Sequence, residues 1–182
     1  MEKNIVIKTL EAIIGTDTIG FISGKVEDIG TGNCSLSDGR GCVYGFAVRI
    51  DENLDELKEK LKEQCSVKND TLDNWMPIKD NWYPLYWGRD LNMGLRLDSH
   101  VKEITGTGTI QLCKIDALKE HVVVYGALPF INYKENEDKM HNRYPDILKT
   151  RKGKKKTTRP SEFLREQLDE NFQIAPDGLI GF

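Results

Sequence analysis

The sequence lacks the features that mark membrane, secreted and zinc-binding proteins. No apolar run approaches the length needed to span a bilayer. The first residues contain neither the long apolar core nor the small-residue cleavage site of a secretory signal. The four cysteines form no Cys-x-x-Cys pair and stand at no zinc-finger spacing from a histidine, so we expect unligated thiols. These absences predict a cytoplasmic protein without a membrane partner.

The length and the composition predict one main globular domain. With 182 residues, of which 38% are hydrophobic and 30% charged, the chain is long enough to bury a core but short for two domains. We expect an N-terminal extension at residues 1–41 that packs on a core at residues 42–150. Residues 151–182 should form a basic arm and a C-terminal helix.

Positive charge is concentrated in one segment of an otherwise acidic chain. The formal net charge is −3, yet seven basic residues and no acidic one lie between residues 149 and 159. They are Lys149, Arg151, Lys152, Lys154, Lys155, Lys156 and Arg159. Subtracting these seven from the 26 basic residues leaves 19, against 29 acidic ones. Clustered cations release counterions when they meet a phosphate backbone, so this segment is either a solvated loop or a nucleic-acid contact.

Hydrophobic patterns predict a sheet with helices against it. Apolar residues at helical spacing indicate a helix at residues 5–14, which Gly15 ends. Residues 16–40 are rich in Gly, Ser, Thr and Asp and should contain turns and short strands. β-branched and aromatic residues predict strands at residues 42–50, 82–88 and 121–128.

Four further helices are expected between and after these strands. Asp51 should cap a helix with Leu54, Leu57 and Leu61 on its apolar side. Two later helices are predicted at residues 133–150, interrupted at Pro145, and at residues 160–172. In the helix after Gly88, the residues at helical spacing that should face the core are Met93, Leu97, Val101 and Ile104.

The helix after Gly88 also carries polar residues. Arg96, His100 and Glu103 lie about 100° away from the apolar side of this helix. We therefore expect them to form a polar stripe beside the sheet rather than within the core.

One stretch combines groups that suit phosphate chemistry. Tyr86-Trp87-Gly88 ends a predicted strand, and Arg96 and His100 follow one helical turn apart. A guanidinium can clamp a phosphate with two parallel hydrogen bonds, and an imidazole and a phenol can handle protons. The spacing resembles the second half of the GIY-YIG nuclease signature, in which Arg follows the Tyr-x-Gly glycine by eight residues and His follows that Arg by four.

This resemblance covers roughly residues 42–150 and implies an α+β fold. The expected core is a small, mainly antiparallel, three-stranded sheet flanked by helices. The chain departs from the family most clearly in an insertion at about residues 51–81, between the first two strands, which should contain a helix.

The first half of the signature has two alignments in this chain. Where the family has Gly-Ile-Tyr, Cys42-Val43-Tyr44 keeps the phenol, whereas Gly45-Phe46-Ala47 does not. We prefer the first alignment, in which Tyr44 and Tyr86 converge from neighbouring strands as the two signature tyrosines do in the family.

The resemblance also implies a glutamate that binds one divalent cation, Mg²⁺ or Mn²⁺. In the family an apolar residue usually follows this glutamate by three positions. Glu137 has Met140 at that distance, whereas its competitor Glu135 has Asp138. One carboxylate together with substrate phosphate is chemically sufficient for such a cation.

The implied catalytic set is Tyr44, Tyr86, Arg96, His100 and Glu137. A tyrosine would remove or orient a proton of the attacking water, Arg96 would stabilise phosphate charge, and His100 would hydrogen-bond a tyrosine or the phosphate. Each of these residues could instead have a purely structural role. The tyrosines could be core aromatics, Arg96 could pair with Asp98 or Glu103, and Glu137 could lie on a solvated helix face.

The sequence is therefore compatible with two functions from different classes. The first is a metal-dependent endonuclease that hydrolyses phosphodiester bonds, with double-stranded DNA as the expected substrate and restriction or defence against foreign DNA as the expected role. The second is a non-catalytic nucleic-acid-binding or scaffold domain that retains the fold. The sequence leaves the oligomeric state open, although cutting both strands with one active centre often requires a homodimer.

Overall fold

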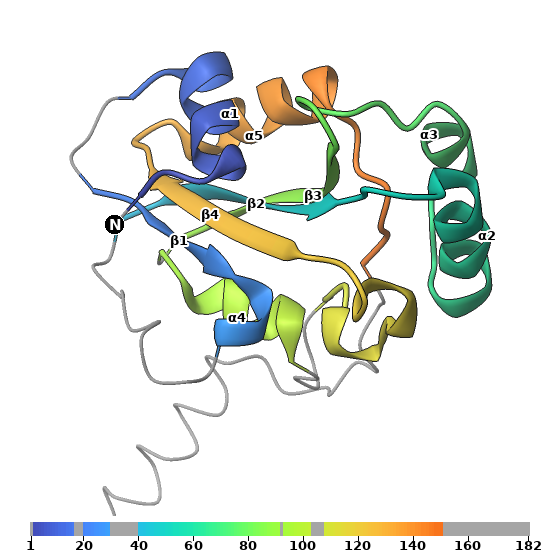
Figure 1. The fold of residues 1–182 in the computed structure, drawn as a ribbon. Helices are drawn as coiled ribbons and strands as arrows, with labels where there is room; N and C mark the ends of the chain where they lie inside the picture. Colours follow the sequence, from blue (N-terminus) through green and yellow to red (C-terminus); the bar gives the residue numbers. More distant parts are fainter. Residues whose placement is uncertain (1, 17–19, 30–39, 92, 103–107, 151–182) are drawn as a thin grey trace, which may run out of the picture.

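A computed structural model of the chain describes residues 2–16, 20–29, 40–91, 93–102 and 108–150 (Figure 1). Its strands are β1 (Ile22–Lys25), β2 (Cys42–Arg49), β3 (Trp82–Asp90) and β4 (Val123–Pro129). Its α-helices are α1 (Ile5–Ile14), α2 (Leu54–Gln64), α3 (Asn69–Asp73), α4 (Leu95–Val101) and α5 (Tyr133–Arg143). Short 3-10 turns lie at Val26–Asp28, Leu112–Lys114 and Asp116–Leu118. The protein thus belongs to the α+β class.

The four strands form one antiparallel sheet in the order β1-β4-β2-β3. The three predicted strands are present as β2, β3 and β4. The expected count of three strands is wrong, because β1 adds a fourth at the edge beside β4, with Ile22 opposite Ala127. β1 lies in the segment that was expected to contain short strands, but its place in the sheet was not predicted, because its pairing with β4 spans about a hundred residues of sequence.

Strand β2 is buried on both faces because helices cover both sides of the sheet. Alternation along the strand directs Tyr44 and Phe46 to one face and Val43 and Ala47 to the other. All residues from Cys42 to Val48 are buried, which explains why the segment reads as a continuous run of apolar and aromatic residues.

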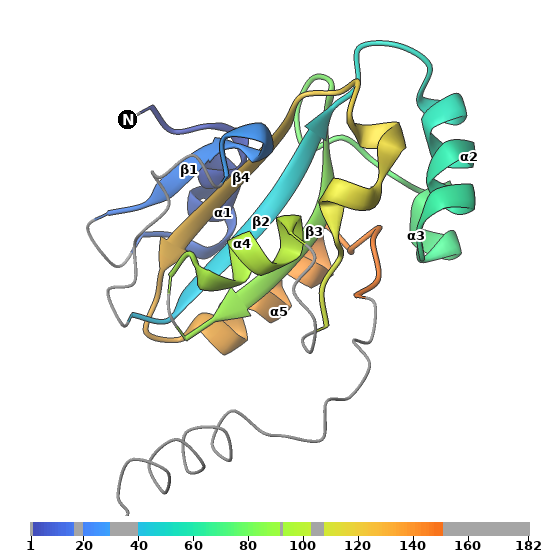
Figure 2. The ribbon, with the colours of Figure 1, turned by 90° about the horizontal axis from the view of Figure 1, so that it is seen from below.

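Helices α1 and α5 lie on one side of the sheet and α4 lies on the other (Figures 1 and 2). On one side, Val6 and Leu10 of α1 and Met140 of α5 pack with Trp87 of β3. On the other side, Leu97 of α4 packs with Tyr44 and Phe46. The helix expected at residues 5–14 is confirmed, and Asn4 caps it by accepting hydrogen bonds from the amides of Val6 and Ile7.

The inserted segment between β2 and β3 contains two helices rather than one. Helices α2 and α3 lie side by side beyond one end of the sheet (Figures 1 and 2). The cap of α2 is Asn53, which accepts from the amide of Glu56, so the expected cap at Asp51 is wrong. Asp51 instead pairs with Arg49 and accepts a hydrogen bond from Asn81.

Helix α5 ends at Arg143, two residues before Pro145, and the chain then follows the outer edge of β3. The amides of Ile147 and Leu148 both donate to the carbonyl of Leu85. This contact covers part of the edge that β3 would otherwise expose. The helix predicted at residues 160–172 and the segment from residue 151 onward lie outside the described residues.

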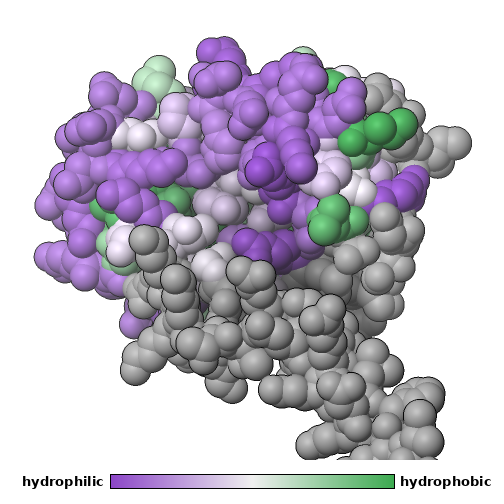
Figure 3. All heavy atoms as spheres, turned by 180° about the vertical axis from the view of Figure 1, so that it is seen from behind, coloured by the Kyte–Doolittle hydropathy of each residue, from purple (hydrophilic) through white to green (hydrophobic). Residues whose placement is uncertain are grey.

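The surface of the described part is mainly hydrophilic when it is seen from behind, with separate hydrophobic spots (Figure 3). The large apolar side chains that are exposed are Met76, Leu91, Val122 and Ile131. No helix within the described ranges has both the length and the apolar character that crossing a bilayer requires.

Candidate active site

Tyr44 and Tyr86 come from neighbouring strands and face the same side of the sheet. Tyr44 lies opposite Gly88, and Phe46 lies opposite Tyr86. The two phenol rings are 6.4 Å apart between centroids. The ring of His100, on α4, lies 5.5 Å from that of Tyr44 and 4.9 Å from that of Tyr86. Three of the five predicted catalytic residues therefore meet between the sheet and helix α4.

The hydrogen bonds of His100 have a defined direction. The amide of Ile110 donates to Nδ1 at 3.2 Å, so Nδ1 carries a lone pair. In a neutral imidazole the proton must then sit on Nε2, which lies 2.6 Å from the Tyr44 hydroxyl oxygen. His100 thus donates to Tyr44. We refer to Tyr86, Tyr44 and His100 with the Ile110 amide as the phenol–imidazole chain.

Burial sets the protonation states of this chain. His100 has 0% of its surface exposed and Tyr44 has 1%. Burial, together with the positive charge of Arg96, lowers the pKa of His100 to about 3, so its ring is neutral at pH 7. Burial also raises the pKa of the Tyr44 hydroxyl well above its ordinary value, which keeps this phenol protonated. The expectation that His100 would lie beside the sheet and outside the core is wrong.

Within the phenol–imidazole chain, Tyr86 is more exposed to solvent than Tyr44. It is half-buried, and burial followed by the charges of Asp146 and Glu137 raises its pKa to about 12. The positive charge of Arg96 acts in the opposite direction. With a pKa of about 12, the Tyr86 hydroxyl keeps its proton at pH 7 and can donate it in a hydrogen bond.

Arg96 lies beside the phenol–imidazole chain. The positive charge of its guanidinium lowers the pKa of the Tyr44 phenol against the effect of burial. Its Nη2 also donates to the carbonyl of Gly108 at 3.4 Å, and its amide donates to the Asp90 carboxylate at 2.8 Å. Asp98, a partner considered from the sequence, pairs with Lys102 instead. Glu103, the other such partner, lies outside the described residues.

Glu137 lies on the other side of the sheet from the phenol–imidazole chain. It belongs to α5, on the opposite side of the sheet from α4 (Figure 1). Its negative charge is nevertheless one of those that raise the pKa of Tyr86. Its carboxylate is 15% exposed, and its Oε2 lies 3.1 Å from Nη1 of Arg89. Glu135, by contrast, is 67% exposed and pairs with Lys139 at 3.1 Å.

Glu137 also belongs to an ionic cluster with His141 and Asp146. His141 has Nε2 at 3.7 Å from Oε1 of Glu137 and Nδ1 at 3.3 Å from Oδ1 of Asp146. The carboxylates of Asp146 and then of Glu137 raise the pKa of His141 to about 9, so its ring is protonated at pH 7. The buried Asp146 carboxylate accepts the amide of Trp87 at 2.8 Å and lies 3.6 Å from Nζ of Lys68. This cluster joins α5 to the edge of β3.

Sequence reasoning missed several of these residues. His141 follows Glu137 by four positions and therefore shares its helix face, a signal present in the sequence but not used. Arg89, Asp146 and the Ile110 amide are brought in by tertiary contacts that no local pattern reveals. Of the seven basic residues, Lys149 is exposed and its amide donates to the carbonyl of Ser66, and the other six lie outside the described residues.

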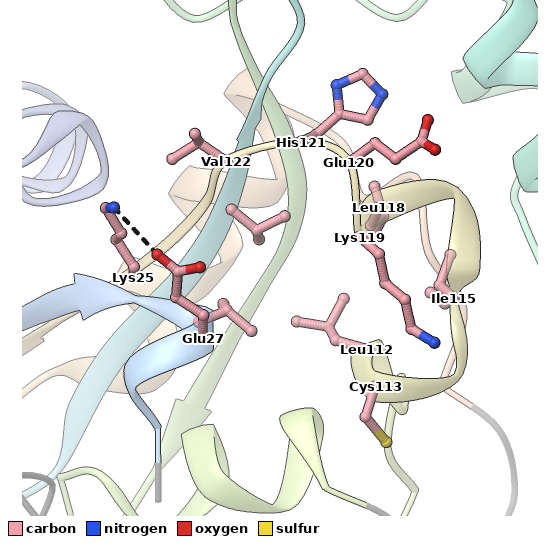
Figure 4. A pocket seen from close by; sticks show the side chains of 12 residues that line it. Lys25, Glu27, Leu112, Cys113, Ile115, Leu118, Lys119, Glu120, His121 and Val122 are labelled. Carbon is pink, nitrogen blue, oxygen red and sulfur yellow. Dashed lines mark hydrogen bonds and ion pairs between the residues drawn. The ribbon is translucent and has the colours of Figure 1, made fainter. Parts of the chain in front are cut away.

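Two cavities of the described part lie away from the predicted residues. One, of about 380 Å³, has apolar walls that include Leu112, Ile115 and Leu118. Figure 4 shows the ion pair of Lys25 and Glu27 among the side chains around it. A second hollow of about 340 Å³ lies at the start of α2. Among the residues placed by the structure, no group of three or more His, Cys, Asp or Glu side chains is arranged to hold a metal ion.

In comparisons with family models, curated proteins and solved structures, nothing matches this chain. The assignment of function therefore depends on the chemistry of its own residues.

Proposed function

We propose that the protein is a divalent-metal-dependent endonuclease that hydrolyses phosphodiester bonds in DNA, as the resemblance to GIY-YIG nucleases implies. The observation that carries this proposal is the contact between Tyr44 and His100, at 2.6 Å across 56 positions of sequence, with Tyr86 and Arg96 beside it. Tyr44, Tyr86, Arg96 and His100, which the resemblance selected from separate parts of the sequence, are thus close together in space. A role in restriction or defence against foreign DNA would suit such an activity.

The geometry supports a division of work between the two phenols. Tyr44 is too deeply buried to touch a substrate, so it acts as a positioning residue for Tyr86. With a pKa of about 12, Tyr86 keeps its proton at pH 7 and is suited to donate a hydrogen bond to the attacking water or to a phosphate oxygen. It is less suited to remove a proton by itself.

Arg96 and His100 have separate parts in this proposal. The half-buried guanidinium of Arg96 would bind the equatorial phosphate oxygens, where negative charge gathers in the transition state. The neutral ring of His100 would hold the Tyr44 hydroxyl in one orientation through Nε2. A preorganised donor of this kind needs no reorganisation when charge develops, because its direction is set by the fold.

Glu137 fits the role of cation ligand in its chemistry and its position. Its carboxylate offers hard oxygen atoms, of which Oε1 is not the one that faces Arg89. Its negative charge contributes to the raised pKa of Tyr86. A Mg²⁺ or Mn²⁺ ion held there would supply Lewis-acid stabilisation of the leaving oxygen.

The test is a nicking assay on supercoiled plasmid with Mg²⁺ or Mn²⁺. The wild type should nick the plasmid only with a divalent cation. Arg96→Ala should lower the rate by about 10²–10³-fold because it removes a transition-state contact, while gel-shift affinity for the plasmid stays within a few fold. Arg49→Ala, at an exposed ion pair far from the site, is the matched control. Full cleavage by the Arg96 variant would reject the assignment.

One observation favours the alternative of a non-catalytic nucleic-acid-binding or scaffold domain. The Glu137 carboxylate is already engaged by Arg89 at 3.1 Å, which competes with a cation. The same assay separates the two functions. Plasmid binding without metal-dependent nicking, in the wild type and in Glu137→Gln alike, would favour the alternative.

A further inference from the structure

Glu137 and His141 face one another on one side of α5. They are four residues apart, and Nε2 of His141 lies 3.7 Å from Oε1 of Glu137. This separation is too long for a hydrogen bond. Two atoms that bind one cation at about 2.1 Å each lie about 3.0–3.6 Å apart for angles of about 90–120° at the metal. The pair is therefore spaced almost as two ligands of one cation would be.

The opposite nitrogen of the same ring is held by a buried carboxylate. Nδ1 of His141 lies 3.3 Å from Oδ1 of Asp146. Asp146 is itself anchored, because the amide of Trp87 donates to that oxygen at 2.8 Å. Metal-binding histidines commonly donate their second ring N–H to a carboxylate, which fixes the tautomer and raises the basicity of the ligating nitrogen. Here that arrangement would leave Nε2, on the side of Glu137, as the ligating atom once a cation displaces its proton.

The charges around the pair set its expected strength. Arg89 engages Oε2 of Glu137 and leaves Oε1 on the side of His141. Arg89 is 42% exposed, so its side chain has room to move when a cation enters. With only two protein ligands and a neighbouring guanidinium, the affinity should be modest, and the remaining positions would be filled by water or substrate phosphate.

We propose that His141 is a second ligand of the divalent cation at Glu137 and that Asp146 orients its ring. This inference rests on the function proposed above, which implies a cation at Glu137 but assigns no nitrogen ligand. An imidazole favours transition metals over Mg²⁺, which prefers oxygen ligands. The site should thus bind Mn²⁺ more tightly than Mg²⁺.

The test measures Mn²⁺ binding to the full chain without nucleic acid. Titration followed by electron paramagnetic resonance gives the affinity, and electron spin echo modulation detects a nitrogen bound to Mn²⁺. His141→Ala should weaken binding by about tenfold or more and abolish the nitrogen modulation. Asp146→Asn should weaken binding by about 10-fold. His121→Ala and Glu135→Gln are matched controls that should bind as the wild type does.

The outcomes separate this inference from the proposed function. Nitrogen modulation in the wild type, lost in His141→Ala and kept in His121→Ala, supports the second ligand. If Glu137→Gln abolishes Mn²⁺ binding while His141→Ala binds with wild-type affinity, His141 is not a ligand and the nuclease proposal is unaffected. If the wild type binds Mn²⁺ without nitrogen modulation, the inference also fails, and this result needs no variant that must fold.

Discussion

The ring of Tyr44 on β2 occupies the space that a side chain at Gly88 on β3 would need. A Cβ built on Gly88 would lie 2.9 Å from Cε2 of Tyr44 and still closer to its hydroxyl. The two residues are direct partners in the β2–β3 register. The glycine of the Tyr-x-Gly motif therefore has a local physical reason, since it allows the Tyr44 phenol to cross β3 and reach His100.

Gly88→Ala should destabilise the protein by about 1–3 kcal/mol, because a methyl group overpacks a buried site. Urea unfolding followed by circular dichroism measures this change. Adding Tyr44→Phe removes the atom closest to the new methyl group, so the double variant should lose less than the sum of the single losses. Strict additivity would mean that Tyr44 is not the obstacle.

Stability should fall in mildly acidic solution because His100 is neutral in the folded protein. Its pKa is about 3 when folded and 6.5 in the unfolded chain, so the unfolded state binds more protons between these values. Stability is therefore complete above pH 6.5 and is lost as the pH falls toward 3. At 1.36 kcal/mol per pH unit, His100 alone should cost about 2 kcal/mol between pH 7 and pH 5.

The comparison that isolates this effect is His100→Gln, which cannot titrate. Urea unfolding of both proteins at pH 7 and pH 5 should show a smaller pH dependence in the variant. Carboxylates elsewhere contribute equally to both proteins and cancel in the difference. An identical pH dependence would mean that His100 is accessible to protons in the folded state.

The two tyrosines should respond differently to loss of the hydroxyl. Tyr44→Phe leaves the buried Nε2–H of His100 without its acceptor, which should cost about 1–3 kcal/mol of stability. Tyr86→Phe removes a hydroxyl from a half-buried side chain and should change stability much less. On the proposed function, Tyr86→Phe should still lower the plasmid-nicking rate by about 10²-fold or more. Urea unfolding and nicking assays on the same preparations would reveal a reversed order, which would contradict this division of roles.

Asn4 connects α1 to the sheet and should be important for this helix. Its Oδ1 accepts from the amides of Val6 and Ile7, and its Nδ2 donates to the carbonyl of Tyr125 at 2.8 Å. Asn4→Ala should destabilise the protein by about 1–2 kcal/mol and accelerate amide hydrogen exchange in α1. Asn53→Ala, which removes the cap of α2, is the control and should accelerate exchange in α2 instead. Unchanged exchange in α1 would show that the cap is dispensable.

The elements that the sequence predicts well are those whose pattern lies within a single segment. Helix α1 has the predicted bounds of residues 5–14, and β2 ends one residue before the predicted end at residue 50. Both are recognised from adjacent residues, by apolar spacing in α1 and by a run of β-branched and aromatic residues in β2. The cap of α2 differs because Asn53 adopts a left-handed backbone conformation with φ of 49°, while Arg49 and Asn81 engage Asp51.

In the candidate site, too, some features were predicted from the sequence and others depend on tertiary contacts. The resemblance to the GIY-YIG signature selected Tyr44, Tyr86, Arg96, His100 and Glu137, and it implied the α+β class together with the order of strands and helices. The burial of His100, the direction of its hydrogen bonds and the ion pair of Glu137 with Arg89 depend on tertiary structure. The same holds for β1, whose four residues form a strand only because β4 pairs with them. A one-dimensional pattern records which side of a helix or strand a residue occupies, but the identity of its neighbours is decided by elements that lie tens of residues away.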